Sequence, residues 1–246
     1  MSKLIVIDSG NIMHKSIFAY RKNQAVPPVY TYMRMIVGYL KRIGVTLNDT
    51  VIIAEDYGSW RKAVDPKYKA QRKGFRESFE DAKWWKDVYT AFNDFTKKMN
   101  LVLPWHFVKI YSMEADDLAS VAARYLNGYD EKILISSDRD WEMLCEVDKV
   151  SIFSPITKKF KIIKNPMKVL LEKIKGDKSD NLLEAPKNEA EFEIRKKIVN
   201  LLKLPNHIEQ EIKEVILNLS PKNLIIDRVP FNTVRESLRK LYLKEE

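Results

Sequence analysis

The chain has 246 residues, 45% of them hydrophobic, which is enough to bury a core as one large domain or as a domain with a smaller attachment. Its 43 Lys and Arg residues outnumber its 34 Asp and Glu residues, and a net charge of +9 indicates a polyanionic partner, with a basic protein that binds no nucleic acid as the alternative. The single cysteine excludes an internal disulfide and a cysteine-based zinc site, and Asp8 interrupts the apolar opening run, so we expect no signal peptide or membrane span and a cytoplasmic protein.

The first predicted elements are strands that end in acids. Residues 3–9 are typical of a buried strand that ends at Asp8, and residues 51–54 predict a second strand followed by Glu55 and Asp56. Between them, apolar residues at helical spacing from Tyr32 to Ile43 predict a helix that covers one face of the sheet. Taken alone, an aspartate at a strand end is also an ordinary turn former.

The composition changes abruptly over residues 61–76, where Lys and Arg residues accompany a single acid, Asp65. Basic side chains contact phosphates, and aromatic rings offer faces on which bases stack, so this segment predicts a nucleic-acid surface. A solvated surface loop is the alternative. The residues assigned to nucleic-acid binding are Arg61, Lys62, Lys67, Tyr68, Lys73 and Arg76.

Two segments carry the densest group of carboxylates. We expect a long helix over residues 84–99 and a strand over 107–110. The next helix begins with three acids in its first turn, Glu114, Asp116 and Asp117, and Ser112 is its expected N-cap. The residues after the next predicted strand, 133–135, include Asp138 and Asp140. A well-capped helix with an acidic start is enough to explain the acids at 114–117 when they are taken alone. Ligand sites form at the carboxyl ends of parallel strands, so the acids at 138 and 140 favour a binding site.

The remainder of the chain changes from strands and helices to helices alone. Residues 150–153 and 160–163 predict a closing pair of strands, and residues 165–166 begin a helix. Asp177 and Asp180 follow in a turn that contains Gly176. Beyond it we expect only helices, the last one after a capping box at residues 233–236, and the one domain boundary near Gly176.

The acids together predict a metal site. The order of strands and helices brings the strand ends to one edge of a parallel sheet, and a cluster of like charges there requires cations. Oxygen ligands without histidine or cysteine suit Mg²⁺ or Mn²⁺, and two such ions hold the attacking water and the leaving oxygen of a phosphodiester. The seven glycines form no phosphate-binding loop, which is evidence against an ATP- or dinucleotide-binding enzyme.

Five motifs in this order resemble the 5′-nuclease superfamily, which includes flap endonucleases, the 5′ to 3′ exonuclease domain of bacterial DNA polymerase I, and the phage RNase H type. They are residues 7–11 (IDSGN), 65–72 (DPKYKAQR), 114–117 (EADD), 137–141 (SDRDW) and 176–181 (GDKSDN). The resemblance implies an α/β fold with a PIN-like core, whose central, mainly parallel sheet is flanked by helices. It further implies a catalytic domain over residues 1–175, a helical arch or clamp over about 60–100, and an all-helical C-terminal region over 176–246.

The resemblance also implies roles for individual residues. Lys69 and Arg72 match the basic pair that stabilises charge on the scissile phosphate. Two Mg²⁺ or Mn²⁺ ions per site are expected. The implied ligands are Asp8, Asp56, Glu114, Asp116 and Asp138 for one ion, and Asp117, Asp140, Asp177 and Asp180 for the other.

The match weakens after Asn181, because no glycine follows Gly176 and the family's Gly-rich helix-hairpin-helix needs glycines in its tight turns. Phage RNase H relatives are similarly irregular here, so the resemblance favours that branch. The implied substrates are branched or 5′-ended DNA and RNA–DNA hybrids, with replication proteins as partners and a monomer as the working form. A PIN-type endoribonuclease and a non-catalytic DNA-binding module are the alternatives.

Overall fold

The computed structural model describes residues 2–71 and 82–244, and its centre is a six-stranded sheet with the strand order β3-β2-β1-β4-β5-β6. The first five strands are parallel and the last is antiparallel to its neighbour. Their bounds are β1 (Lys3–Asp8), β2 (Thr50–Glu55), β3 (Trp105–Lys109), β4 (Glu131–Ile135), β5 (Val150–Ser154) and β6 (Lys159–Phe160). The expected α/β fold is confirmed.

The central strands have unbroken inner runs of apolar residues, such as Leu4 to Ile7 of β1 and Val51 to Ala54 of β2, and both faces of the sheet are covered. Leu4 and Val6 of β1 belong to one buried cluster, and Ile5 and Ile7 belong to the other, as the two-residue repeat of a strand requires. The chain builds β2 and β3 on one side of β1 and then returns to place β4 and β5 on the other. The crevice between β1 and β4 at their carboxyl ends is therefore the expected ligand position for an open α/β sheet.

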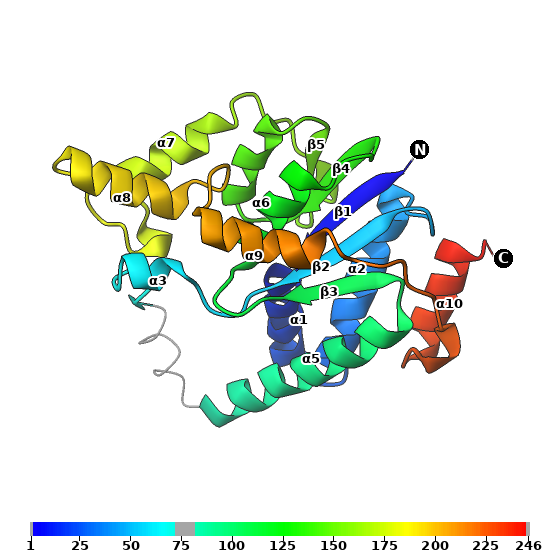
Figure 1. Cartoon of the computed structure of the whole chain (residues 1–246). Coiled ribbons are helices and arrows are strands. Elements are labelled where there is room, and N and C mark those ends of the chain that lie inside the picture. The colour runs from blue at the N-terminus through cyan, green and yellow to red at the C-terminus, as the bar shows by residue number, and fades with distance from the viewer. Residues whose placement is uncertain (1, 72–81, 245–246) are drawn as a thin grey trace.

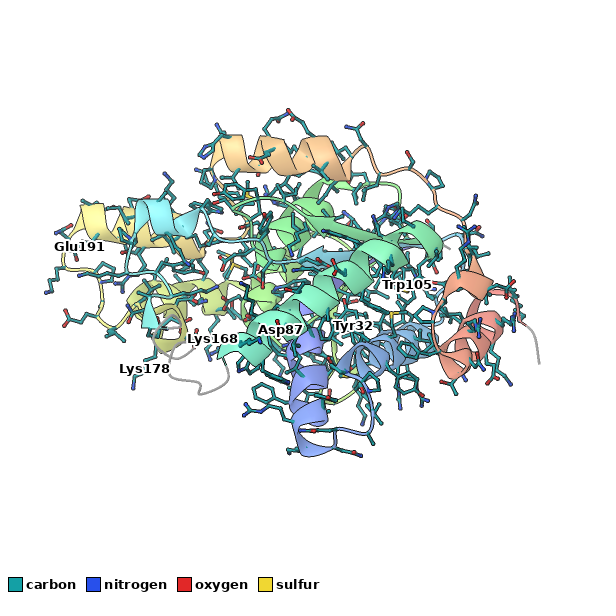
Figure 2. The ribbon with its side chains drawn as sticks, turned by 90° about the horizontal axis from the view of Figure 1, so that it is seen from below. Tyr32, Asp87, Trp105, Lys168, Lys178 and Glu191 are labelled. Atoms are coloured by element: carbon teal, nitrogen blue, oxygen red, sulfur yellow. The ribbon has the colours of Figure 1, made fainter. Side chains whose placement is uncertain are left out.

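The helices form two layers on opposite faces of the sheet (Figure 1). One layer contains α1 (Ser9–Lys22), α2 (Pro28–Ile43), α5 (Ala82–Val102) and α10 (Asn232–Tyr242), and Figure 2 shows α5 running across it. The other contains α3 (Arg61–Val64), α6 (Ala115–Tyr125), α7 (Met167–Lys175), α8 (Glu189–Val199) and α9 (Asn206–Ile216). Three short 3-10 helices complete the described chain: η1 (Asp140–Glu146), η2 (Lys178–Asp180) and η3 (Ile226–Arg228).

The C-terminal helices are built into both layers. Ile198 of α8 and Ile212 of α9 are part of the first buried cluster, and Leu238 of α10 is part of the second. Gly176 ends α7, at the position of the expected boundary. The division of the chain into two domains there stays a prediction. Within residues 2–71 and 82–244, no helix is both long and apolar enough to cross a bilayer.

Several local expectations differ from the structure. The strand expected over residues 160–163 is found only as β6, Lys159–Phe160. Helix α1 was not expected, because its apolar periodicity is weak; it begins directly after β1, where the Asp8 carboxylate accepts a hydrogen bond from the Asn11 N–H at 2.9 Å. The last helix begins at Asn232, one residue before the expected capping box. The N-cap of α6 is Glu114 rather than Ser112, and the Asp117 carboxylate accepts from the Glu114 N–H at 3.0 Å.

Candidate metal centre

The carboxyl ends of β1, β2 and β4 open into one cleft that gathers acids from distant parts of the chain. Parallel strands place their ends at the same edge, and the N-terminus of α6 and the helices η1 and η2 border it. Seven of the nine acids expected from the sequence line this cleft, together with the ammonium of Lys69. They are Asp8, Asp56, Glu114, Asp116, Asp138, Asp140 and Asp180.

The tightest group in the cleft is formed by Asp116, Asp138 and Asp140, which each offer an oxygen within 4.8 Å of the others. The Trp141 indole N–H donates to Asp116 Oδ1 at 2.5 Å, and the Asp140 N–H donates to Asp138 Oδ1 at 2.9 Å. Burial, and then the charge of Asp138, raises the pKa of Asp116 well above its ordinary value. Crowded oxygen ligands of this kind fit a hard divalent cation, which would offset their repulsion.

Asp8 and Asp56 face the same small space beside Gly10. A Cβ at Gly10 would lie 3.1 Å from Asp56 Oδ2 and 3.6 Å from Asp8 Oδ1, so the missing side chain leaves room between the two carboxylates. Ser136 Oγ donates to Asp8 Oδ2 at 2.7 Å and orients it. Burial, with smaller contributions from Asp56 and Asp138, raises the pKa of Asp8 to about 6.

Lys69 reaches into the cleft from the basic segment. Its Nζ lies 2.6 Å from Glu114 Oε1 and 3.7 Å from Asp180 Oδ1. The second oxygen of Glu114 accepts from Arg61 Nη1 at 2.8 Å. Burial alone would raise the pKa of Glu114, but the charges of Arg61 and Lys69 outweigh it and hold the pKa at about 2. Glu114 is therefore an ionised carboxylate that positions the Lys69 ammonium in the cleft, and its expected role as a metal ligand stays a prediction.

A family model described as "5′-3′ exonuclease, N-terminal resolvase-like domain" matches residues 3–174. The chain belongs to this exonuclease family. Ribonuclease H of Enterobacteria phage T4 is 29% identical over 147 residues, which are 58% of this chain and 47% of the relative. The chain thus spans about half the length of that curated relative.

Solved structures share the fold of this exonuclease family member. A T5 protein co-crystallised with metal ions has a TM-score of 0.64 and 19% identity, over 87% of this chain and 98% of that one. The T5 5′-exonuclease bound to divalent zinc ions has a TM-score of 0.58 and 18% identity, over 97% of each chain. At this identity the likeness concerns the fold, including the parallel sheet at whose edge the acids meet.

Two of the nine expected ligands do not line the cleft. Asp117 is fully buried, and its oxygens lie 2.7 Å from Arg61 Nη2 and 3.0 Å from Arg61 Nη1, with the Trp60 indole N–H donating to it at 3.2 Å. Asp177 caps η2 by accepting from the Ser179 N–H at 2.7 Å. Neither carboxylate lines the cleft, and we do not count them among the ligands proposed below.

The residues expected to contact nucleic acid include buried side chains and exposed ones. Arg61 is 2% exposed, and Tyr68 is 3% exposed with its hydroxyl donating to Glu114 at 3.2 Å. Both side chains are buried against the start of α6, and their contact with nucleic acid stays a prediction. Lys62 and Lys67 are exposed. Arg72, Lys73 and Arg76 lie outside the described residues, as does part of the expected arch.

The described part of the basic segment, residues 61–71, is hydrogen-bonded to the turn after α7. The Lys69 N–H donates to the Asp180 carbonyl at 3.1 Å, and the Asn181 amide donates to the Lys67 carbonyl at 2.9 Å. Two backbone hydrogen bonds of 2.7 Å between Asp177 and Leu182 close the turn itself. The motifs at 65–72 and 176–181 therefore form one unit that sets Lys69 and Asp180 side by side.

Sequence reasoning missed two lysines at this site. Lys15 of α1 donates to Asn11 Oδ1 at 2.8 Å beside Ser137. Residues four apart share one face of a helix, so a prediction of α1 would have placed Lys15 next to Asn11. Lys173 of α7 contacts Asp140 directly and lies 2.7 Å from Asp180 Oδ2 and 3.0 Å from Asp177 Oδ2. From the sequence it is an ordinary basic residue in the last turn of a helix.

Proposed function

We propose that this chain is a metal-dependent 5′ nuclease that hydrolyses phosphodiester bonds at 5′ flaps, 5′ ends or RNA–DNA hybrids. The observation that supports this most directly is the cleft in which seven carboxylates and Lys69 meet at the carboxyl ends of β1, β2 and β4. Family membership supports the reaction class, and the net charge of +9 supports a polyanionic substrate.

The proposed cofactor is a pair of Mg²⁺ or Mn²⁺ ions. Asp8, Asp56, Asp116 and Asp138 would hold the first, and Asp140 with Asp180 would contribute to the second. When bound, the ions supply a lowered pKa for the attacking water and neutralise charge on the leaving oxygen.

The residues of the chain itself do the positioning. Lys69, held by Glu114, would donate to a non-bridging oxygen of the scissile phosphate and stabilise its developing charge. The exposed Lys62 and Lys67 would contact neighbouring phosphates, which set the position of the strand without reading its sequence. Action as a monomer and contact with replication proteins stay predictions.

The test uses 5′-labelled flap, 5′-recessed and RNA–DNA hybrid substrates with Mg²⁺ and, separately, Mn²⁺. Wild type is expected to release short 5′ products, and Asp138→Asn to lose that activity. Asp148→Asn is the matched control, because Asp148 is an exposed aspartate ahead of β5. No cleavage with either metal would contradict the proposal, and cleavage of single-stranded RNA without need of a free 5′ end would favour a PIN-type endoribonuclease instead.

A further inference from the structure

Lys173 is a buried cation in the region expected to hold the second metal ion. It lies in the last turn of α7, and its side chain is 8% exposed. Its ammonium contacts Asp140 and lies 2.7 Å from Asp180 Oδ2 and 3.0 Å from Asp177 Oδ2. An ammonium has three donors and a compact charge, and here three carboxylates surround it.

Asp140 links this lysine to the metal ligands. Its carboxylate belongs to the group formed with Asp116 and Asp138, and it is also an ion-pair partner of Lys173. A divalent ion held by Asp116 and Asp138 can bind while Lys173 keeps its contacts to Asp177 and Asp180. An ion bound between Asp140 and Asp180 would have to take the place of the ammonium, because both carboxylates already contact it.

We infer that the Lys173 ammonium is a resident cation in the position of the second ion, so that a second divalent ion binds only when Lys173 is displaced. The inference rests on the proposed function, which requires divalent ions in this cleft. It makes Lys173 a positioning residue that sets the order of ion binding. The first ion binds between Asp116 and Asp138, and the second binds more weakly because it must break the contacts of the ammonium with three carboxylates.

The experiment counts Mn²⁺ ions bound to the full chain, without substrate, by titration calorimetry and by electron paramagnetic resonance of free Mn²⁺. Wild type is expected to bind one ion tightly and a second at least about tenfold more weakly. In Lys173→Met the affinity for the second ion should rise at least about tenfold, equivalent to about 1.4 kcal/mol. A second-ion affinity that stays equal to that of wild type, or falls, would overturn the inference.

Lys168→Met is the control, because Lys168 lies on the same helix, carries the same charge and has a side chain that is 65% exposed (Figure 2). Its substitution should leave both Mn²⁺ affinities unchanged. An equal gain of second-ion affinity in Lys168→Met would mean that general charge, and not the place of Lys173, weakens the second ion, and would overturn the inference as well.

A measurement on wild type covers the case in which Lys173→Met does not fold. Anomalous diffraction at rising Mn²⁺ concentration should first give one peak between Asp116 and Asp138 with Lys173 in place, and a second peak only with its side chain moved. Two peaks with Lys173 still in contact with Asp140 and Asp180 would overturn the inference while leaving the proposed function intact. No Mn²⁺ in the cleft would overturn both.

Discussion

The Arg61 guanidinium determines how the start of α6 presents its acids. It binds Asp117 through two nitrogens and Glu114 through one, and its Nε donates to the Ile198 carbonyl at 2.7 Å. This links the basic segment, α6 and the end of α8 at a single buried side chain. With Asp117 engaged in this way, Asp116 is the residue of the pair that faces the cleft.

Replacing Arg61 with methionine should destabilise the protein by about 3–5 kcal/mol, because two buried carboxylates would lose their cation. Urea unfolding followed by circular dichroism at neutral pH measures the change. Lys62→Met, at the exposed neighbouring position, should stay within about 0.5 kcal/mol of wild type. A loss of under about 1 kcal/mol for Arg61→Met would mean that the ion pair contributes little.

Lys69 is expected to act on the reaction more than on binding. Removing its charge in Lys69→Met should lower the single-turnover cleavage rate by about 10²–10³-fold, because the scissile phosphate would lose a donor that is already held in place. The dissociation constant for a flap substrate, measured without divalent ions, should change little. Lys67→Met is the comparison, and we expect it to weaken binding and to leave the rate at saturation unchanged. The opposite pattern for the two lysines would exclude the role of Lys69.

At the scale of elements, the strand β3 joins the C-terminal segment through a small polar group. Lys222 Nζ donates to the Asn100 carbonyl at 2.6 Å and to the Trp105 carbonyl at 3.1 Å. Burial, and then the positive charge of Lys222, lowers the pKa of His106 to about 4. The His106 imidazole on β3 is therefore neutral at neutral pH.

This arrangement predicts a pH dependence of stability. The unfolded chain takes up a proton at His106 near pH 6.5 and the folded chain near pH 4, so the contribution of His106 is complete above 6.5 and is lost as the pH falls toward 4. His106→Gln should lose less unfolding free energy than wild type over this window, as measured by urea unfolding at a series of pH values. His207→Gln, at an exposed histidine, should follow wild type. Parallel curves for wild type and His106→Gln would contradict the prediction.

At the scale of the whole molecule, folding creates the candidate metal centre, since its acids come from segments as far apart as Asp8 and Asp180. An ion that binds only the folded state stabilises it, by about 2.7 kcal/mol at a hundred times its dissociation constant. We therefore expect Mg²⁺ to raise the melting temperature of wild type in a concentration-dependent way, and chelation to reverse the shift.

Asp138→Asn should change the melting temperature both without metal and in its response to Mg²⁺. Without metal it should melt at a higher temperature than wild type, because one of three crowded carboxylates is gone, and Mg²⁺ should shift it less. Asp148→Asn should respond to Mg²⁺ as wild type does. Differential scanning calorimetry measures these melting temperatures. If Mg²⁺ raises the melting temperature of Asp138→Asn as much as that of wild type, the ion binds elsewhere.

Much of this molecule is predictable from the chain because the relevant signals are local. Apolar strand runs, each followed by an aspartate, are sufficient to expect an α/β fold with acids at one sheet edge, as β1 with Asp8 and β4 with Asp138 show. Helix α1 was harder to predict, since much of its surface is polar and its start is indicated mainly by the Asp8 cap.

Local patterns along the chain are enough to predict the class of fold and the edge at which the acids gather, and the family resemblance adds Lys69 near them. Which of the acids are open to an ion depends on the packing of the folded chain. Asp116 and Asp117 are adjacent on a helix, so their side chains point about 100° apart. The buried Arg61 takes one and the cleft receives the other. Likewise, the lysine at 173 is an unremarkable helical residue until folding surrounds it with Asp140, Asp177 and Asp180. Spacing along a chain fixes neighbours within an element, whereas the direction a side chain faces across elements depends on packing.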